Sequence, residues 1–118
     1  MFATFSPDGK QVAYVHRNNL YVQDLSDFHI APLTKDGSDT LINGTFDWVY
    51  EEELFLRNGF RWSPDSRSIA YWQLDTTGMR DYVLVNTTED LYPKLTTIRY
   101  PKVGQANPSS RVRCSKRG

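Results

Sequence analysis

Residues 5–14 read FSPDGKQVAY and residues 62–71 read WSPDSRSIAY, and the two stretches align without a gap. Each begins with an aromatic residue and Ser-Pro-Asp, continues through small, basic, polar and β-branched positions, and ends in Ala-Tyr. Proline fixes φ for a turn and aspartate hydrogen-bonds its own local backbone, so each stretch predicts a β-turn that leads into a strand. A unit used twice is typical of β repeat architectures.

Strands are predicted after both turns. Residues 11–17 follow the first turn, and residues 18–25 follow through a hairpin at Asn18-Asn19, because asparagine tolerates positive φ. Residues 68–74 follow the second turn and are nearly continuous in apolar and aromatic residues, which predicts a strand buried on both faces. Residues 80–86 are expected to be the equivalent of the 18–25 strand in the second unit.

The stretch FDWVYEEELFLRNGF, residues 46–60, interrupts this pattern with three consecutive glutamates. The repeat, from residue 5 to residue 62, is also longer than the roughly 40 to 50 residues of common propeller blades, so we interpret the stretch as an insertion. A short helix is predicted near residues 47–56, because Asp47 can cap it and acidic residues favour the positive end of a helix dipole. The glutamates either hold a cation or only form a solvated helix start.

The composition excludes several kinds of site. Among 118 residues there are 14 Lys plus Arg and 14 Asp plus Glu, so no net charge attracts nucleic acid. The single cysteine, Cys114, excludes an intrachain disulfide and a multi-thiolate metal site. His16 and His29 lack the spacing of a metal-ligand pair. We therefore predict no metal, no cofactor and no nucleic-acid partner.

Past residue 86 the sequence favours extended and turned structure, because prolines stand at positions 93, 101 and 108. A strand is predicted near Leu95 to Tyr100. The basic end RVRCSKRG, residues 111–118, is predicted to be a frayed terminus rather than a nucleic-acid or lipid patch. Asn43 and Asn86 each begin a glycosylation sequon, which predicts that both asparagines are exposed.

Three landmarks in order resemble a known family: TFSPDGKQVAYV at residues 4–15, DWVYEEELF at 47–55 and YPKVGQANP at 100–108. They are similar to successive parts of the N-terminal β-propeller domain of the dipeptidyl peptidase IV family, within the prolyl oligopeptidase superfamily. The resemblance implies an all-β fold, a partial β-propeller of about two blades, with one short inserted helix that carries the glutamate motif. Residues 1–118 would then be a fragment of that propeller domain.

The same resemblance implies a role for the glutamates. In the family, a double-glutamate motif in the propeller insertion binds the free amino terminus of a peptide substrate, and the matching residues here are Glu52 and Glu53. An ammonium has three donors and no acceptor, so two carboxylates can hold and orient it. Aromatic neighbours are expected to lower the local dielectric constant and strengthen this contact. The supporting residues are Glu51, as a structural neighbour, with Asp47, Trp48 and Tyr50.

No catalytic residue is expected in this chain. The superfamily's α/β-hydrolase domain presents its serine on a G-x-S-x-G turn, followed by an aspartate and a histidine, and no G-x-S-x-G occurs here. The resemblance therefore implies part of a serine exopeptidase that releases dipeptides from peptide N-termini, with its hydrolase domain absent from these residues.

The partners implied by the resemblance are a peptide with a free N-terminus, the hydrolase domain of the same protein and a second copy in a homodimer. The implied location is periplasmic, secreted or membrane-anchored. The alternative hypothesis is a non-enzymatic propeller module, of the TolB-like or WD-repeat-like kind, that binds protein or peptide.

Overall fold

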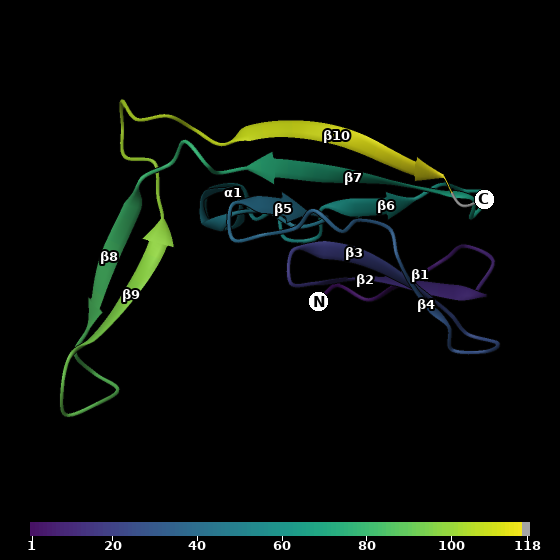
Figure 1. Ribbon diagram of the computed structural model, residues 1–118, viewed down its shortest axis with the longest axis horizontal. Helices are drawn as coiled ribbons and strands as arrows, with labels where there is room; N and C mark the ends of the chain where they lie inside the picture. Colours follow the sequence, from purple (N-terminus) through teal and green to yellow (C-terminus); the bar gives the residue numbers. More distant parts are fainter. Residues whose placement is uncertain (117–118) are drawn as a thin grey trace.

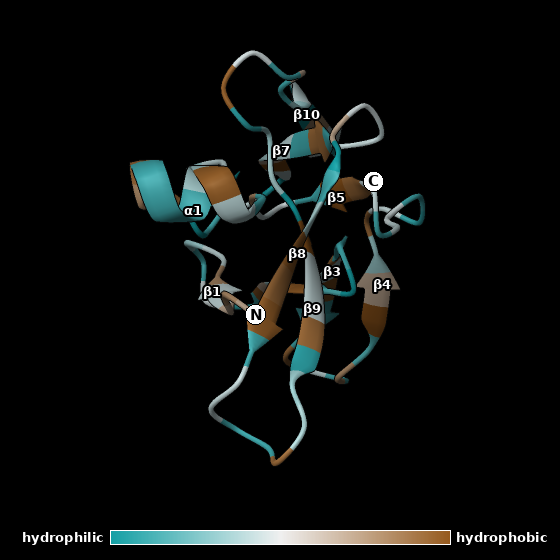
Figure 2. Ribbon diagram, turned by 90° about the vertical axis from the view of Figure 1, so that its left-hand side faces the viewer, coloured by the Kyte–Doolittle hydropathy of each residue, from teal (hydrophilic) through white to brown (hydrophobic). Residues whose placement is uncertain are grey.

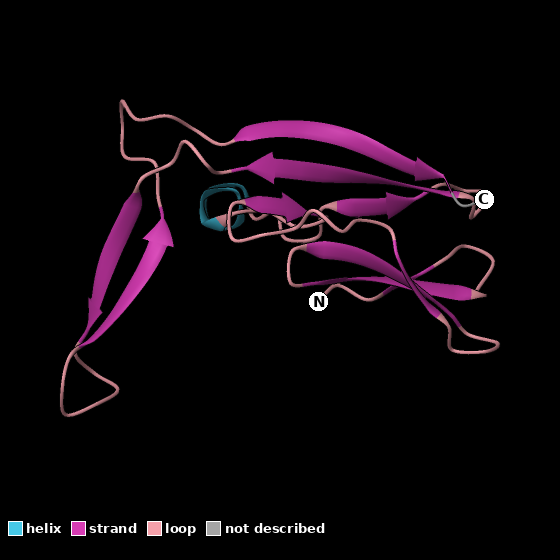
Figure 3. Ribbon diagram, viewed as in Figure 1, coloured by secondary structure: helices cyan, strands magenta, loops and turns pink. Residues whose placement is uncertain are grey.

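Two four-stranded sheets and a projecting hairpin make up the fold in the computed structural model, which describes residues 1–116 (Figure 1). The first sheet is antiparallel, in the order β1-β2-β3-β4. Its strands are β1 (Thr4–Phe5), β2 (Gln11–His16), β3 (Asn19–Asp24) and β4 (Ile30–Pro32). One short helix, α1 (Trp48–Leu54), stands among strands within residues 1–116, which confirms the predicted all-β fold with one inserted helix (Figure 3). No helix in this range is long and apolar enough to cross a bilayer.

The second sheet is built on one long strand, β7 (Ser68–Asp75). Strand β10 (Ser109–Lys116) pairs with all eight residues of β7. The other edge of β7 is filled by two short strands, β5 (Leu41–Asn43) and β6 (Phe60–Trp62). β5 and β6 are therefore two halves of one outer strand, and the segment between them is the insertion that carries α1.

The two Ser-Pro-Asp turns have the same hydrogen bonds. Ser6 Oγ donates to Asp8 Oδ1 at 2.6 Å, and Ser63 Oγ donates to Asp65 Oδ1 at 2.6 Å. In each turn this bond, together with a backbone N–H two residues further on, lowers the pKa of the aspartate carboxyl. The register of β1 against β2 is repeated by β6 against β7. The structural unit predicted from the two stretches is thus confirmed at the level of single hydrogen bonds.

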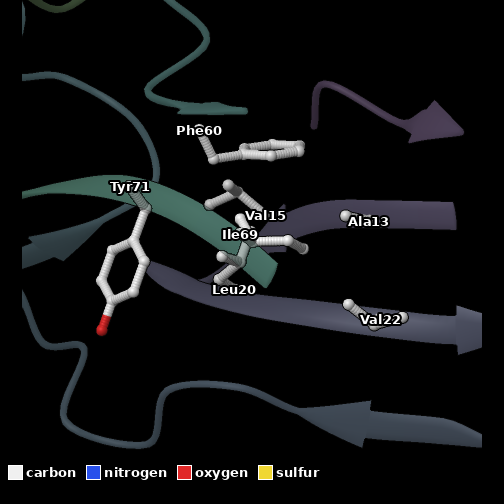
Figure 4. Packing of buried hydrophobic residues seen from close by; sticks show 7 residues of the cluster. All are labelled: Ala13, Val15, Leu20, Val22, Phe60, Ile69 and Tyr71. Carbon is white, nitrogen blue, oxygen red and sulfur yellow. The ribbon is translucent and has the colours of Figure 1, made fainter. Parts of the chain in front are cut away.

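A small apolar core joins the two sheets (Figure 4). In Figure 4, Ile69 of β7 lies beside Val15 and Leu20 of the first sheet, and all three are fully buried. Burying one such side chain contributes about 1.5 to 3 kcal/mol relative to leaving it exposed. The core residues are Ala13, Val15, Leu20 and Val22 from the first sheet and Phe60, Ile69 and Tyr71 from the second.

A group of polar side chains centred on buried Asn43 and Gln73, here called the polar clip, joins the sheets beside the core. Asn43 Nδ2 donates to Asn18 O at 3.2 Å and to Asp36 Oδ1 at 2.9 Å. Gln73 Nε2 donates to Asn43 Oδ1 at 2.8 Å and to Asp36 Oδ2 at 3.1 Å, and Arg113 Nε donates to Gln73 Oε1 at 2.7 Å. Asn43 is 0% exposed, so the prediction that its sequon is exposed is wrong. Its amide is buried because these partners satisfy it.

A two-stranded hairpin, here called the arm, leaves the second sheet between β7 and β10 and projects away from both sheets (Figure 1). Its strands β8 (Asp81–Asn86) and β9 (Lys94–Arg99) pair only with each other within residues 1–116. Strand β9 confirms the strand predicted near residues 95–100. Apolar segments of the arm are visible as brown ribbon in Figure 2. Its exposed large apolar strand residues are Tyr82, Val83, Leu84, Val85 and Leu95.

The arm and β10 overturn two predictions about the second unit. Residues 80–86 are not the equivalent of β3, because β8 pairs with β9 and the place beside β7 is taken by β10. The basic end is not frayed, since residues 109–116 form β10, and residues 117 and 118 lie outside the described range. Complete pairing of the β7 backbone favours this arrangement.

Two local predictions are also wrong. The hairpin turn is Arg17-Asn18, with φ of 47° and 59°, and Asn19 already belongs to β3. From Ile69 to Gln73 the residues of β7 alternate between buried and exposed, so that Ile69 is buried while Trp72 is 40% exposed. Within the part of the chain that the structure describes, β7 is therefore buried along one face and, on the other face, only at Leu74.

We expect Gly9→Ala to lower the free energy of unfolding by about 1 kcal/mol, because an L-residue is disfavoured at φ +71° although nothing lies within 4 Å of an added Cβ. The matched control is Gly78→Ala, where the space is equally open and φ is not left-handed, so its effect should be neutral or slightly stabilising. Urea denaturation of both variants beside the unchanged protein measures the difference. Equal unfolding free energies for Gly9→Ala and the unchanged protein would contradict the strain argument.

Candidate functional site

The insertion between β5 and β6 has a narrow neck formed by Gly44 and Gly59. The N–H of Gly59 donates to Gly44 O at 3.0 Å, and a Cβ on Gly59 would lie 2.9 Å from the Gly44 carbonyl carbon. Next to them Thr45 and Asn58 form an isolated bridge, and Thr45 Oγ1 donates to Arg57 O at 2.9 Å. Only glycine fits such an approach, so the two ends of the insertion are fixed side by side.

Both ends of α1 have defined caps. Asp47 is the N-cap, and its Oδ1 accepts the N–H of Tyr50 at 3.1 Å. Phe55 ends the helix in the left-handed region, at φ 55°, and its N–H donates to Tyr50 O. The predicted helix and its Asp47 cap are therefore confirmed. None of its seven residues is buried, so the placement of the helix depends on a few side-chain contacts.

The three glutamates have different surroundings. Glu51 Oε1 lies 3.1 Å from Arg57 Nε, within the same insertion. Glu52 and Glu53 are exposed, and neither forms an ion pair with another residue of the described range. Adjacent helical positions diverge by about 100°, so these two carboxylates can approach one cation from two directions.

Three aromatic residues of the insertion pack at the start of α1, whereas Phe55 at its end is 86% exposed. Phe46 stacks on Tyr50 with 5.7 Å between ring centroids, and the ring of Trp48 meets that of Tyr100 edge-on at 5.1 Å. Phe46 also lies 6.2 Å from Trp72 of β7. The packed rings turn toward the sheet and the arm, and Glu52 and Glu53 are exposed in this part of the chain, so the predicted aromatic effect on a bound ammonium stays a prediction.

Asp47 has one carboxylate oxygen bonded and one unsatisfied. The residue is 6% exposed, and Oδ2 has no hydrogen-bond partner within residues 1–116. Burial raises the pKa of this carboxyl, and the bond from the Tyr50 N–H opposes the shift. Asp47 lines an open cavity of about 500 Å³ together with Trp48 of the helix and Asp81 and Arg99 of the arm. This cavity lies where the start of α1 meets the base of the arm.

Two residues that hold the glutamate helix were not identified from the sequence. Arg57 lies beyond helical i,i+4 spacing from Glu51, so no local rule pairs them. Tyr100 lies after the arm, and only the folded arm brings it beside Trp48. No group of three or more His, Cys, Asp or Glu side chains within residues 1–116 is placed to hold a metal ion.

Comparison with known proteins places this architecture in a family. Residues 1–116 match the family described as "Dipeptidyl peptidase IV (DPP IV) N-terminal region". Dipeptidyl aminopeptidase B of Saccharomyces cerevisiae is 36% identical over 93% of this chain, and probable dipeptidyl peptidase 4 of Aspergillus clavatus is 36% identical over 98%. The crystal structure of Porphyromonas gingivalis dipeptidyl peptidase 4 superposes on 98% of this chain with a TM-score of 0.91 and 34% identity.

The chain spans only a small part of each of these proteins: 14% and 16% of the two fungal sequences and 17% of the bacterial chain. The match nevertheless covers every strand, the arm and the glutamate helix, because it extends from residue 1 to residue 116. The chain therefore belongs to the family of the dipeptidyl peptidase IV N-terminal region.

Proposed function

We propose that α1 presents Glu52 and Glu53 to the α-ammonium of a peptide substrate, as the substrate-gating part of a serine-type dipeptidyl peptidase. One observation carries the proposal: two adjacent exposed carboxylates without ion-pair partners in residues 1–116 stand on a helix capped at both ends, while Glu51 is paired with Arg57. The relatives named dipeptidyl peptidase or dipeptidyl aminopeptidase support the reaction class.

The chemistry of the pair suits an amino terminus. Charge-assisted hydrogen bonds from an ammonium to two carboxylates fix both the position and the direction of the first residue. A substrate held at its amino terminus presents one particular peptide bond to a nucleophile at a fixed distance, which is how positioning lowers the barrier. The serine, aspartate and histidine are proposed to come from a hydrolase domain outside these 118 residues.

Glu52→Ala or Glu53→Ala is expected to lower kcat/KM for free-amine dipeptide substrates by about thirtyfold or more in the full-length protein. In the proposed complex the bound substrate excludes water from the contact, and removing one partner of such a charged hydrogen bond costs about 2 to 5 kcal/mol, of which 2 kcal/mol corresponds to about thirtyfold. Glu51→Ala is the matched control, because an exposed ion pair such as Glu51 with Arg57 contributes at most about 1 kcal/mol. Steady-state kinetics with a chromogenic dipeptide substrate provides the measurement.

An N-acetylated form of the same substrate separates charge recognition from general damage. It lacks the cation, so it should react poorly with the unchanged protein and lose little more in the Glu52 and Glu53 variants. Near-normal activity of both variants on the free-amine substrate would refute the proposal that Glu52 and Glu53 bind the ammonium. A complete absence of peptidase activity in the full-length protein would instead favour the non-enzymatic binding module.

The chain of 118 residues by itself is expected to hydrolyse no peptide, because binding carboxylates cannot replace a nucleophile. Incubation of the purified chain with the chromogenic substrate should therefore release no product above the uncatalysed rate. Turnover that a serine-directed inhibitor abolishes would show that a catalytic serine lies within these residues.

We further propose that the full-length protein is a homodimer in which the arm of one copy contacts the other copy. The arm has an unpaired edge on each strand within residues 1–116 and exposes apolar side chains on both of its faces. Val83 and Val85, on one face, are 51% and 59% exposed. Exposed apolar side chains in succession on a projecting hairpin are typical of an association surface.

The double substitution Val83→Asp with Val85→Asp should convert the dimer into a monomer, since it places charges in the proposed contact without altering a buried residue. Thr87→Asp, at the exposed tip of the same arm, is the control and should leave the dimer intact. Sedimentation velocity gives the mass of each species. A monomeric unchanged protein, or a dimer that survives the double substitution, would contradict the proposed contact.

A further inference from the structure

We infer that Tyr100, at the base of the arm, is a positioning residue for the glutamate helix. The inference rests on the proposed function of Glu52 and Glu53 and extends it to a residue outside the glutamate stretch. Tyr100 contacts Trp48 at the start of the helix, at the opposite end from Phe55. Its proposed role is therefore to place the two carboxylates and not to bind the substrate itself.

The glutamate helix has few contacts that hold it. It is seven residues long and buries none of them, and a helix of this length is not stable by itself in water. Glu51, in the first turn, pairs with Arg57, which follows the helix, but both residues belong to the insertion and both side chains are exposed by more than a third. That pair ties the insertion to itself and does not fix its direction relative to the sheets.

Two ring contacts near the first turn reach beyond the insertion. Phe46, which stacks on Tyr50, lies against Trp72 of β7, and Trp48 makes the contact with the arm. Trp48 is the first residue of α1, and its ring meets Tyr100 at 5.1 Å with an interplanar angle of 71°. Tyr100 is itself fixed, because its N–H donates to Arg80 O at 3.2 Å and its ring lies 6.0 Å from that of Tyr82 in β8. A series of three rings therefore connects the helix start to the first strand of the arm.

The cavity beside these rings supports the same conclusion. It is bordered by Asp47 and Trp48 from the helix start and by Thr97, Ile98 and Arg99 from the arm. The Asp47 cap has one unsatisfied buried oxygen there, and Arg99 Nη1 donates to the carbonyls of Thr76 and Met79 at 3.2 and 3.4 Å rather than to Asp47. Within residues 1–116, polar groups thus do not join the helix start to the arm, and the ring of Tyr100 makes the connecting contact.

Placement of the helix bears directly on recognition. A catalytic or binding group must lie within about 0.5 Å of its productive position, and a displacement of about 1 Å can lower a rate a hundredfold. Removing the Tyr100 ring releases the start of the helix, so the two carboxylates no longer meet the ammonium together. The effect should appear for substrates that carry the ammonium and should be small for those that do not.

The test compares Tyr100→Ala, Tyr100→Phe and Tyr92→Ala in the full-length protein. Tyr100→Ala should lower kcat/KM for a free-amine dipeptide substrate about tenfold and change it less than twofold for the N-acetylated form. Tyr100→Phe keeps the ring and should retain the ratio of the two values. Tyr92, at the exposed tip of the arm, has no ring contact within residues 1–116, so Tyr92→Ala is the matched control and should change neither value.

Two outcomes would overturn the inference: an unchanged ratio in Tyr100→Ala, whether both values stay the same or fall equally, or a loss in Tyr100→Phe as large as in Tyr100→Ala. A thermal melt of each variant identifies any that fails to fold, and Tyr100→Leu then replaces Tyr100→Ala. The Glu52 and Glu53 variants are measured in parallel. If the ratio of kcat/KM for the free-amine substrate to that for the N-acetylated substrate falls in the Glu52 and Glu53 variants but not in Tyr100→Ala, only the positioning role of Tyr100 fails. If the ratio is unchanged in the Glu52 and Glu53 variants, the proposed binding of the ammonium by these glutamates fails.

Discussion

The backbone of β7 has to find a hydrogen-bond partner for every N–H and C=O group, and this requirement arranges the rest of the chain. β10 pairs along one edge, while the other edge is shared between β5 and β6. At the junction of the two short strands, the Trp72 N–H donates to Gly59 O at 2.8 Å and Trp72 O accepts the Gly44 N–H at 2.9 Å. The ladder is thus continuous although the chain leaves it for a whole helix.

The same strand explains why the helix and the arm meet. The insertion departs opposite Trp72, and the arm departs just after Asp75, where Ser109 of β10 later returns. Both excursions therefore begin at the C-terminal half of β7 and lie beside each other, which brings Trp48 and Tyr100 into contact. No residue of α1 is buried, and its ring contacts reach β7 through Phe46 and the arm through Trp48.

Local chemistry made the repeat and the helix predictable. The Ser-Pro-Asp turns specify their own hydrogen bonds, and Asp47 caps the helix three residues before its partner Tyr50. The arm was not predictable, because residues 80–86 have the apolar and β-branched composition of a strand but nothing in them says that the partner is β9 rather than β7. Strand β10 was not predictable either, because its basic residues are typical of a solvated terminus. Arg113 donates to Gln73, a contact that exists only in the folded chain. Likewise, the contact of Tyr100 with Trp48 depends on the whole arm.

The polar clip has a consequence for protein maturation. Asn43-Gly44-Thr45 has the sequence that oligosaccharyltransferase accepts, yet both hydrogens of the Asn43 amide are donated, to Asn18 O and to Asp36 Oδ1. A sugar on that nitrogen would remove one of these donors and would have to enter a site with no exposed surface. Carbohydrate at Asn43 is therefore compatible only with an unfolded chain, and folding and glycan transfer at this residue exclude one another.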